Sequence, residues 1–171
     1  LTEIRHDRIR KIAFNHPDGD RTILERMEKS DFDFTYLEVP DGMRALAPSK
    51  LNSVGGALAF LSMKDVRSES ALNFDPTEAT VTRFETWDGV AVTVSTIDVD
   101  GEKRARFHAE FNESLVFEKI SVPEPSAGES DEEGGETVDP YAAERGEVSK
   151  ISARTQGWAY VLDDNKMDQL R

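Results

Sequence analysis

The sequence contains no cysteine among its 171 residues. This absence excludes disulfide bonds, thiolate catalysis and cysteine-type zinc sites together. It does not fix the redox compartment, because a chain without cysteine is compatible with both the cytosol and the periplasm. Any chemistry or binding must therefore come from other residue types.

Long apolar runs are also absent. No stretch approaches the roughly 20 consecutive apolar residues that a membrane-spanning helix requires. No secretory leader is visible, and the chain starts at Leu1 rather than at a methionine. We therefore expect this chain to be a processed or excised part of a longer protein.

Basic residues are scarce relative to acidic ones. The chain has 21 Lys and Arg against 34 Asp and Glu, which gives a formal net charge of −13 and a pI of about 4.7. This balance argues against binding nucleic acid, because phosphate backbones are held by clustered Lys and Arg. It also argues against unaided docking on an anionic membrane surface. We interpret the charge as a source of solubility, with a basic protein partner as the alternative.

Recognisable catalytic patterns are missing as well. His6, His16 and His108 lie on separate predicted elements and share no metal-ligand spacing. No serine sits in a G-x-S-x-G nucleophile elbow, and the Asp-Gly segments lack the further oxygen ligands of a calcium loop. A hydrolytic enzyme would require His16 or His108 to meet a serine and a carboxylate in space. We expect no enzyme activity, no catalytic residues, no cofactor and no metal site.

The most informative stretch runs from Ala79 to Phe111. It predicts three antiparallel strands joined by two tight turns at Asp88-Gly89 and Asp100-Gly101. An Asp-Gly pair supplies the positive φ angles of a two-residue hairpin turn. The second and third strands alternate apolar with polar or charged residues, which is typical of a sheet with one face on the core and one face in water.

The remaining pattern predicts an α+β fold of antiparallel meanders. Strands are expected at 8–16, 21–27, 32–39 and 64–72, with turns at Pro17-Asp18-Gly19 and Pro40-Asp41-Gly42. One main helix, at about 48–62, is expected to pack on the sheet, because Leu51, Val54, Leu58 and Leu61 recur at helical spacing. Gly55-Gly56 within it indicates a close approach to the sheet, with a hinge as the alternative.

The last third of the chain divides at a change in composition. Residues 1–120 are predicted to form the core, in the order β-β-β-α-β-β-β-β. Residues 121–146 are rich in Pro, Gly and acidic side chains, and we expect a flexible exposed insertion there. Residues 147–171 are expected to form a helix, a strand at 158–162 and a final helical turn that pack back on the core, so that the whole chain forms one domain.

Four residues are candidates for an interaction surface: Trp87, Asp88, Trp158 and Tyr160. Aromatic residues within strands are more often core than surface, so a structural role is the competing interpretation. A binding domain for a small apolar or lipid-like ligand, held between the sheet and the 48–62 helix, is the alternative function. The Gly55-Gly56 gap and Trp87 or Trp158 motivate it.

An ordered set of short motifs resembles the bacterial family called domain of unknown function 4340. The set covers nearly the whole chain apart from the acidic insertion, which departs from the shorter linker expected in the family. It comprises Arg8-Ile9, Lys11-Ile12, His16-Pro17-Asp18-Gly19, Leu24-Glu25-Arg26, the Leu51–Leu61 helix, Asp65-Val66-Arg67, Phe84-Glu85-Thr86-Trp87-Asp88-Gly89, Gly157-Trp158-Ala159-Tyr160, Lys166 and Leu170.

The resemblance implies a location and a neighbourhood, but no catalytic residues. Members of such a family typically carry an N-terminal membrane helix followed by repeated strand-and-helix units outside the cytoplasm, and this chain resembles the C-terminal unit. Relatives are often encoded beside gliding-type ABC transporter components. We therefore expect a non-catalytic interaction module on the periplasmic side of the bacterial inner membrane. Its partners would be envelope proteins, and it would reach the membrane only through a segment absent from this chain.

Overall fold

The computed structural model describes residues 1–38, 42, 46–99, 101–118 and 139–171. Within these residues, eight strands form one sheet in the order β3-β2-β1-β5-β6-β7-β8-β4, and all neighbours are antiparallel. The strands are β1 (Ile9–Asn15), β2 (Arg21–Glu25), β3 (Thr35–Glu38), β4 (Met63–Ser68), β5 (Thr80–Thr86), β6 (Val90–Val99), β7 (Glu102–Phe111) and β8 (Trp158–Leu162). The helices are α1 (Pro48–Gly55), α2 (Ala142–Thr155) and α3 (Asp164–Gln169). The predicted α+β class is confirmed.

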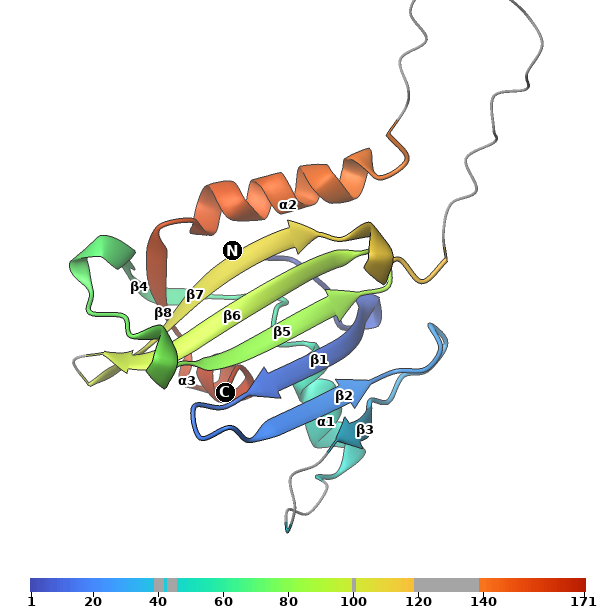
Figure 1. Ribbon diagram of the computed structural model, residues 1–171, viewed down its shortest axis with the longest axis horizontal. Coiled ribbons are helices and arrows are strands. Elements are labelled where there is room, and N and C mark those ends of the chain that lie inside the picture. Colours follow the sequence, from blue (N-terminus) through green and yellow to red (C-terminus); the bar gives the residue numbers. More distant parts are fainter. Residues whose placement is uncertain (39–41, 43–45, 100, 119–138) are drawn as a thin grey trace, which may run out of the picture.

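The two faces of the sheet have different surroundings. Helices α1 and α3 lie behind the sheet in the view of Figure 1, and we call the face they cover the inner face. The core lies there, and its fully buried members include Ile12, Phe84, Val92, Leu162 and Leu170. The opposite, outer face carries polar and charged side chains of the central strands. The expected alternation along β6 and β7 therefore produces one core face and one wet face.

The central hairpins form at the predicted positions. Strand β6 pairs with β5 on one side and with β7 on the other. Gly89 in the first turn has φ +88°, and a β-carbon added to it would lie within 2.9 Å of Val116, Phe111 and the Asn112 carbonyl. Gly101 in the second turn has φ +78°, while Asp100 lies outside the described residues. Glycine at position 89 is thus required both by its φ and by the lack of space for a side chain.

The prediction of one main helix at 48–62 is wrong in extent. Helix α1 ends at Gly55, where the backbone lies against the rings of Phe34 and His6. The chain then continues in tight turns, with the Ala59 amide donating to the Gly56 carbonyl at 3.2 Å. Leu58 and the later Leu61 are buried from this turn rather than from a helix. The helical spacing of Leu51, Val54, Leu58 and Leu61 did not distinguish a helix over 48–62 from a shorter helix followed by a turn.

The longest helix is α2, with 14 residues, and it begins inside the predicted 121–146 insertion. Its start is held by Tyr141, whose ring packs on Phe111 at 5.1 Å, and by Arg145, whose guanidinium lies 4.7 Å from that ring. The helix runs beside β7 (Figure 1). Strand β8 pairs with β7 at Ala105. Residues 142–146 are therefore ordered helix. The prediction for 121–138 falls outside the described residues.

The C-terminal strand β8 lies between β7 and β4. Tyr160 pairs with Ala105 of β7 and with Val66 of β4. Strand β4 ends at Ser68, and the rest of the strand predicted at 64–72 is a 3-10 turn at Glu69–Ala71. None of the helices in the described parts of the chain has the length and apolar character that a membrane crossing requires.

Candidate functional site

The four predicted surface residues do not form one surface. Trp87 is 4% exposed and lies between the guanidinium groups of Arg10 and Arg26, at 5.7 and 5.8 Å from its ring. Tyr160 is 3% exposed, and burial raises the pKa of its phenol. Trp158 alone of the three aromatics reaches solvent, with 44% of its surface exposed. The competing core interpretation therefore holds for Trp87 and Tyr160.

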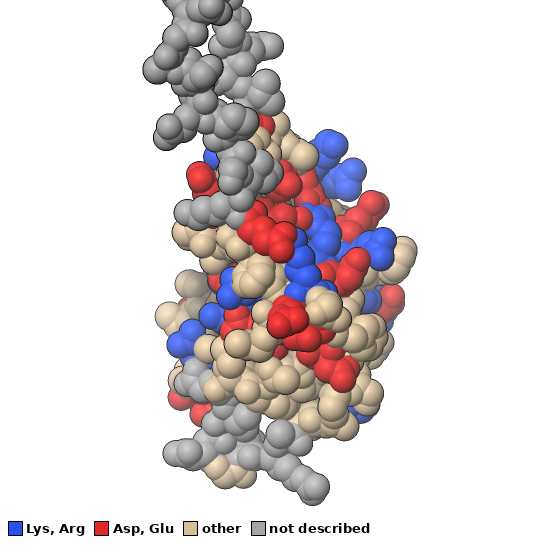
Figure 2. All heavy atoms as spheres, turned by 90° about the vertical axis from the view of Figure 1, so that its right-hand side faces the viewer, with Lys and Arg blue, Asp and Glu red and all other residues tan. Residues whose placement is uncertain are grey.

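Asp88 belongs to an ion network that joins three elements. Arg8 contacts the Asp88 carboxylate at 2.9 Å and holds both oxygens of Glu147 at 2.9 and 2.8 Å. The hydrogen bonds to Glu147, followed by the charge of Asp88, raise the pKa of Arg8 above its usual range. Figure 2 views this end of the sheet, where β1 begins and β5 ends, and acidic and basic side chains alternate across it. The network links α2 to the sheet. Because acidic and basic groups are mixed there, this end of the sheet carries no patch of uniformly positive or uniformly negative charge.

None of the three histidines is paired with a serine nucleophile and a carboxylate in the described residues. His16 lies 3.4 Å from the Thr80 hydroxyl, and His6 packs between the rings of Phe32 and Phe34. In the described parts of the chain, no histidine hydrogen-bonds a serine or a carboxylate. No group of three His, Asp or Glu side chains that could hold a metal ion occurs among those residues either.

The loop after α1 presents one aromatic side chain to solvent. Phe60 is 90% exposed and has a φ of +53°, a backbone conformation that bulky residues rarely adopt. Its neighbours face the other way, since Ala57 and Leu58 are fully buried and Leu61 is 9% exposed. Phe60 lies off the apolar stripe formed by Leu51, Val54, Leu58 and Leu61. An aromatic residue off that stripe was the signal that sequence reasoning missed.

The Phe60 loop is held by hydrogen bonds from distant parts of the chain. The Lys166 ammonium donates to the carbonyls of Gly56 and Ala59, both at 2.9 Å. The Thr2 hydroxyl donates to the Leu58 carbonyl at 2.6 Å. Partial burial of the Lys166 side chain lowers its pKa. The loop is thus a fixed platform, and Phe60 projects from it.

Further apolar groups surround Phe60. Phe32 is 71% exposed and lines the same open hollow of about 340 Å³ as Phe60 and Ala59. A second hollow of about 280 Å³, on another side of Phe60, is lined in part by Leu1. We call Leu1, Phe32, Ala59 and Phe60 the Phe60 surface. Phe32 and Phe60 are exposed and Leu1 and Ala59 are half-buried. Exposed aromatic residues gathered beside further apolar groups are typical of interaction sites.

The space between α1 and the sheet is filled with side chains. Leu51 and Leu58 belong to the core cluster, and Val54 packs against it. A methyl group built on Gly55 would lie 2.4 Å from Cε2 of Phe34. The Gly55 gap is therefore occupied by an aromatic ring. The alternative of an apolar ligand between the sheet and this helix has no supporting feature at that place.

Comparison with protein-family models, with curated proteins and with solved structures found no match to this chain. The resemblance to the domain of unknown function 4340 family stays a prediction that rests on its ordered residue set.

Proposed function

We propose that this chain is a non-catalytic protein-interaction module that inserts Phe60 into an apolar pocket of a partner protein. The observation that carries the proposal is an aromatic side chain held outward at positive φ on a loop fixed by Lys166 and Thr2. Neither solvent nor the core stabilises a phenyl ring in that position. A pocket in a partner does.

Strain and preorganisation support this use of Phe60. A left-handed backbone costs a residue with a β-carbon about 1 to 2 kcal/mol, and such outliers cluster at functional sites. A loop already fixed in its bound shape loses little entropy on association. Buried aromatic anchors at the centre of an interface supply much of its binding energy. Phe60, flanked by Phe32, fits such an anchor.

The partner is an envelope protein in this proposal. The family resemblance supports a place on the periplasmic side of the inner membrane and an accessory role beside an ABC transporter. The net charge of −13 favours a partner whose contact surface is basic around its apolar pocket.

The substitution Phe60→Asn tests the proposal without endangering the fold. Asparagine tolerates the left-handed conformation, so we expect the free energy of unfolding to stay equal or to rise by up to about 1 kcal/mol. Leu37→Thr is the matched control, because Leu37 is 53% exposed on edge strand β3 and threonine suits a strand. Both variants are compared with the unchanged chain in its full-length protein.

The measurement is affinity capture from envelope extracts, followed by titration of the purified captured component. We expect a membrane-complex component to bind and Phe60→Asn to weaken that binding at least about tenfold, the size of a hot-spot truncation. Leu37→Thr should bind as the unchanged chain does. The proposal is wrong if no membrane-complex component is captured, or if Phe60→Asn binds as tightly as Leu37→Thr.

A further inference from the structure

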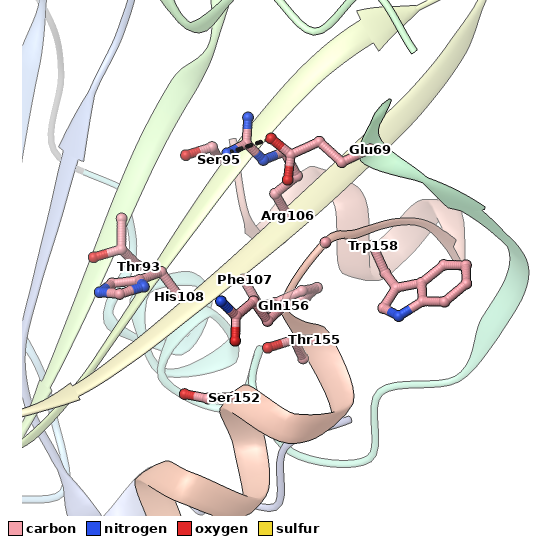
Figure 3. Close-up of a pocket in the computed structure, with 11 residues that line it drawn as sticks. Glu69, Thr93, Ser95, Arg106, Phe107, His108, Ser152, Thr155, Gln156 and Trp158 are labelled. Atoms are coloured by element: carbon pink, nitrogen blue, oxygen red, sulfur yellow. Dashed lines mark ion pairs between the residues drawn. The ribbon is translucent and has the colours of Figure 1, made fainter. Parts of the chain in front are cut away.

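A polar hollow of about 250 Å³ lies on the outer face of the sheet, away from the Phe60 surface. It forms where the C-terminal end of α2 and the turn into β8 meet the middle of β6 and β7 (Figure 3). Its volume is below the roughly 300 Å³ at which sites for drug-sized ligands begin. A ligand of this hollow is therefore small.

One wall of the polar hollow is a neutral, fixed ion pair. The Arg106 guanidinium contacts Glu69 at 2.9 Å, drawn as the dashed line in Figure 3. The same guanidinium lies 4.4 Å from the centre of the Phe74 ring. These two contacts hold Arg106 in place and cancel its charge. The wall offers hydrogen-bond donors and acceptors without a net attraction for ions.

Four other polar side chains of the hollow are uncommitted, whereas Thr155 donates to the Ile151 carbonyl at 3.0 Å and Thr93 accepts from Arg83 at 3.5 Å. Ser95, His108, Ser152 and Gln156 make no side-chain hydrogen bond to the parts of the chain that the structure describes. Figure 3 shows Ser152 and Gln156 on the α2 side and His108 on the sheet side of the same opening. The hydroxyl groups of Ser95 and Ser152 and the amide of Gln156 each both donate and accept hydrogen bonds. Their natural complement is a ligand whose groups also do both.

Trp158 supplies the apolar part of the hollow. Its indole is 44% exposed and lies across the opening from His108 and Thr93 in Figure 3. A tryptophan ring combines a flat apolar face with a polar edge. It can therefore cover the C–H face of a ring whose rim carries hydroxyl groups.

We infer that the polar hollow binds a single sugar unit. A neutral ring with several hydroxyls and an apolar face matches the uncommitted donor–acceptor groups, the charge-neutral wall and the exposed indole. A free anion would gain little from Arg106, because Glu69 already balances the charge of that guanidinium and the whole chain carries a net charge of −13. A purely apolar ligand would leave the polar groups unpaired, which is costly.

The chain has two tryptophans, which allows a direct optical test. In a Trp87→Phe background, Trp158 is the single indole reporter. Titration uses D-glucose, D-mannose and N-acetyl-D-glucosamine up to about 100 mM, so that binding with a dissociation constant of a few millimolar reaches saturation. The methyl glycoside of each sugar represents a terminal glycan unit, and sodium glutamate and inorganic phosphate represent anions. Amide NMR shifts of the unchanged chain provide the same readout without the Trp87 substitution.

We expect a saturable change in Trp158 emission with at least one sugar, and shifts centred on Gln156 and Trp158. Gln156→Ala should weaken binding about fivefold, as loss of one or two hydrogen bonds predicts, while Asn165→Ala, at an exposed position of α3, should not. A response to the methyl glycoside identifies a glycan end, and its absence identifies a free sugar. The inference is overturned if no sugar saturates, if only the anions bind, or if both alanine variants bind alike.

Discussion

Arg26 carries a guanidinium that is withdrawn from water and bonded to carbonyl oxygens instead of carboxylates. Its side chain donates to the carbonyls of Ile9 at 2.8 Å, Asp31 at 3.0 Å and His6 at 2.8 Å. It also lies 5.0 Å from the centre of the Phe34 ring. This cation fastens the N-terminal turn to β1 and to the loop before β3. It is also a fixed positive charge beside the His6 ring.

His6 should make stability depend on pH below its ordinary pKa of about 6.5. Burial, followed by the charge of Arg26, lowers the pKa of His6 in the folded chain. At a pH between the lowered pKa of folded His6 and its ordinary pKa in the unfolded chain, the unfolded chain binds the proton more readily. The free energy of unfolding therefore decreases as the pH falls below about 6.5. Urea unfolding at pH 7.5 and 5.5 should show a larger loss for the unchanged chain than for His6→Gln. His108→Gln, at an exposed ring, should behave as the unchanged chain, and equal losses in all three would contradict the prediction.

Helix α1 shows how two adjacent glycines can have different roles. Gly55 is the last helical residue and packs against Phe34 and His6, whereas Gly56 begins the turn toward Phe60. A methyl group on Gly56 would meet only the Ser53 carbonyl, at 3.6 Å. Gly56 has φ −89°, which other residues adopt without strain. The close approach predicted from the Gly55-Gly56 pair therefore belongs to Gly55 alone, and it is made to Phe34 and His6, which lie outside the strands, and not to the sheet as predicted.

Alanine substitutions should separate these two glycines. Gly55→Ala should lower the free energy of unfolding by about 1 to 3 kcal/mol, because its methyl group would lie 2.4 Å from Phe34 and 2.6 Å from His6 in a packed site. Gly56→Ala should be neutral or stabilising by up to about 1 kcal/mol, since alanine restricts the unfolded chain. Chemical denaturation of both variants provides the measurement. A stabilising Gly55→Ala would show that the Phe34 and His6 rings move aside freely.

At the scale of the whole molecule, the C-terminal tail completes the sheet and the core. Strand β8 joins edge strand β4 to the central strands, and Arg104 of β7 reaches Asp65 of β4 at 3.1 Å. Beyond β8, Met167 and Leu170 close the inner face, and the Thr82 hydroxyl of β5 donates to the Leu170 carbonyl at 2.8 Å. Chain ends usually fray unless they are tied down in this way.

Leu170, the penultimate residue, should therefore contribute like an interior core residue. It is fully buried, and Leu170→Ala should cost about 2 to 5 kcal/mol of unfolding free energy. The matched control is Asp168→Ala, which removes an exposed side chain and its 3.2 Å ion pair with Lys103. Such surface pairs contribute at most about 1 kcal/mol. Thermal or urea unfolding that finds the two variants equally stable would refute the described packing of the tail.

Prediction from the sequence succeeded where the structure is local. The Asp88-Gly89 hairpin and the alternation of β6 and β7 depend on residues a few positions apart, and strand β8 has the predicted bounds. The candidate site was predicted poorly. Trp87 and Tyr160 share the β-propensity of surface aromatics, and neighbours remote in sequence cover them, among them Arg26 and Phe117 at Trp87 and Phe107 at Tyr160. Local composition carries no information about such neighbours.

The sequence by itself determined the α+β class and the central antiparallel strands, because alternation and turn chemistry act within each hairpin. Only the tertiary structure decided that α2 is the longest helix, since Phe111 anchors a start that composition marks as insertion. It also decided that α1 stops at Gly55 and that Phe60 points outward. Those outcomes depend on contacts with Phe34, His6, Thr2 and Lys166, which are remote along the chain and meet only in the folded molecule.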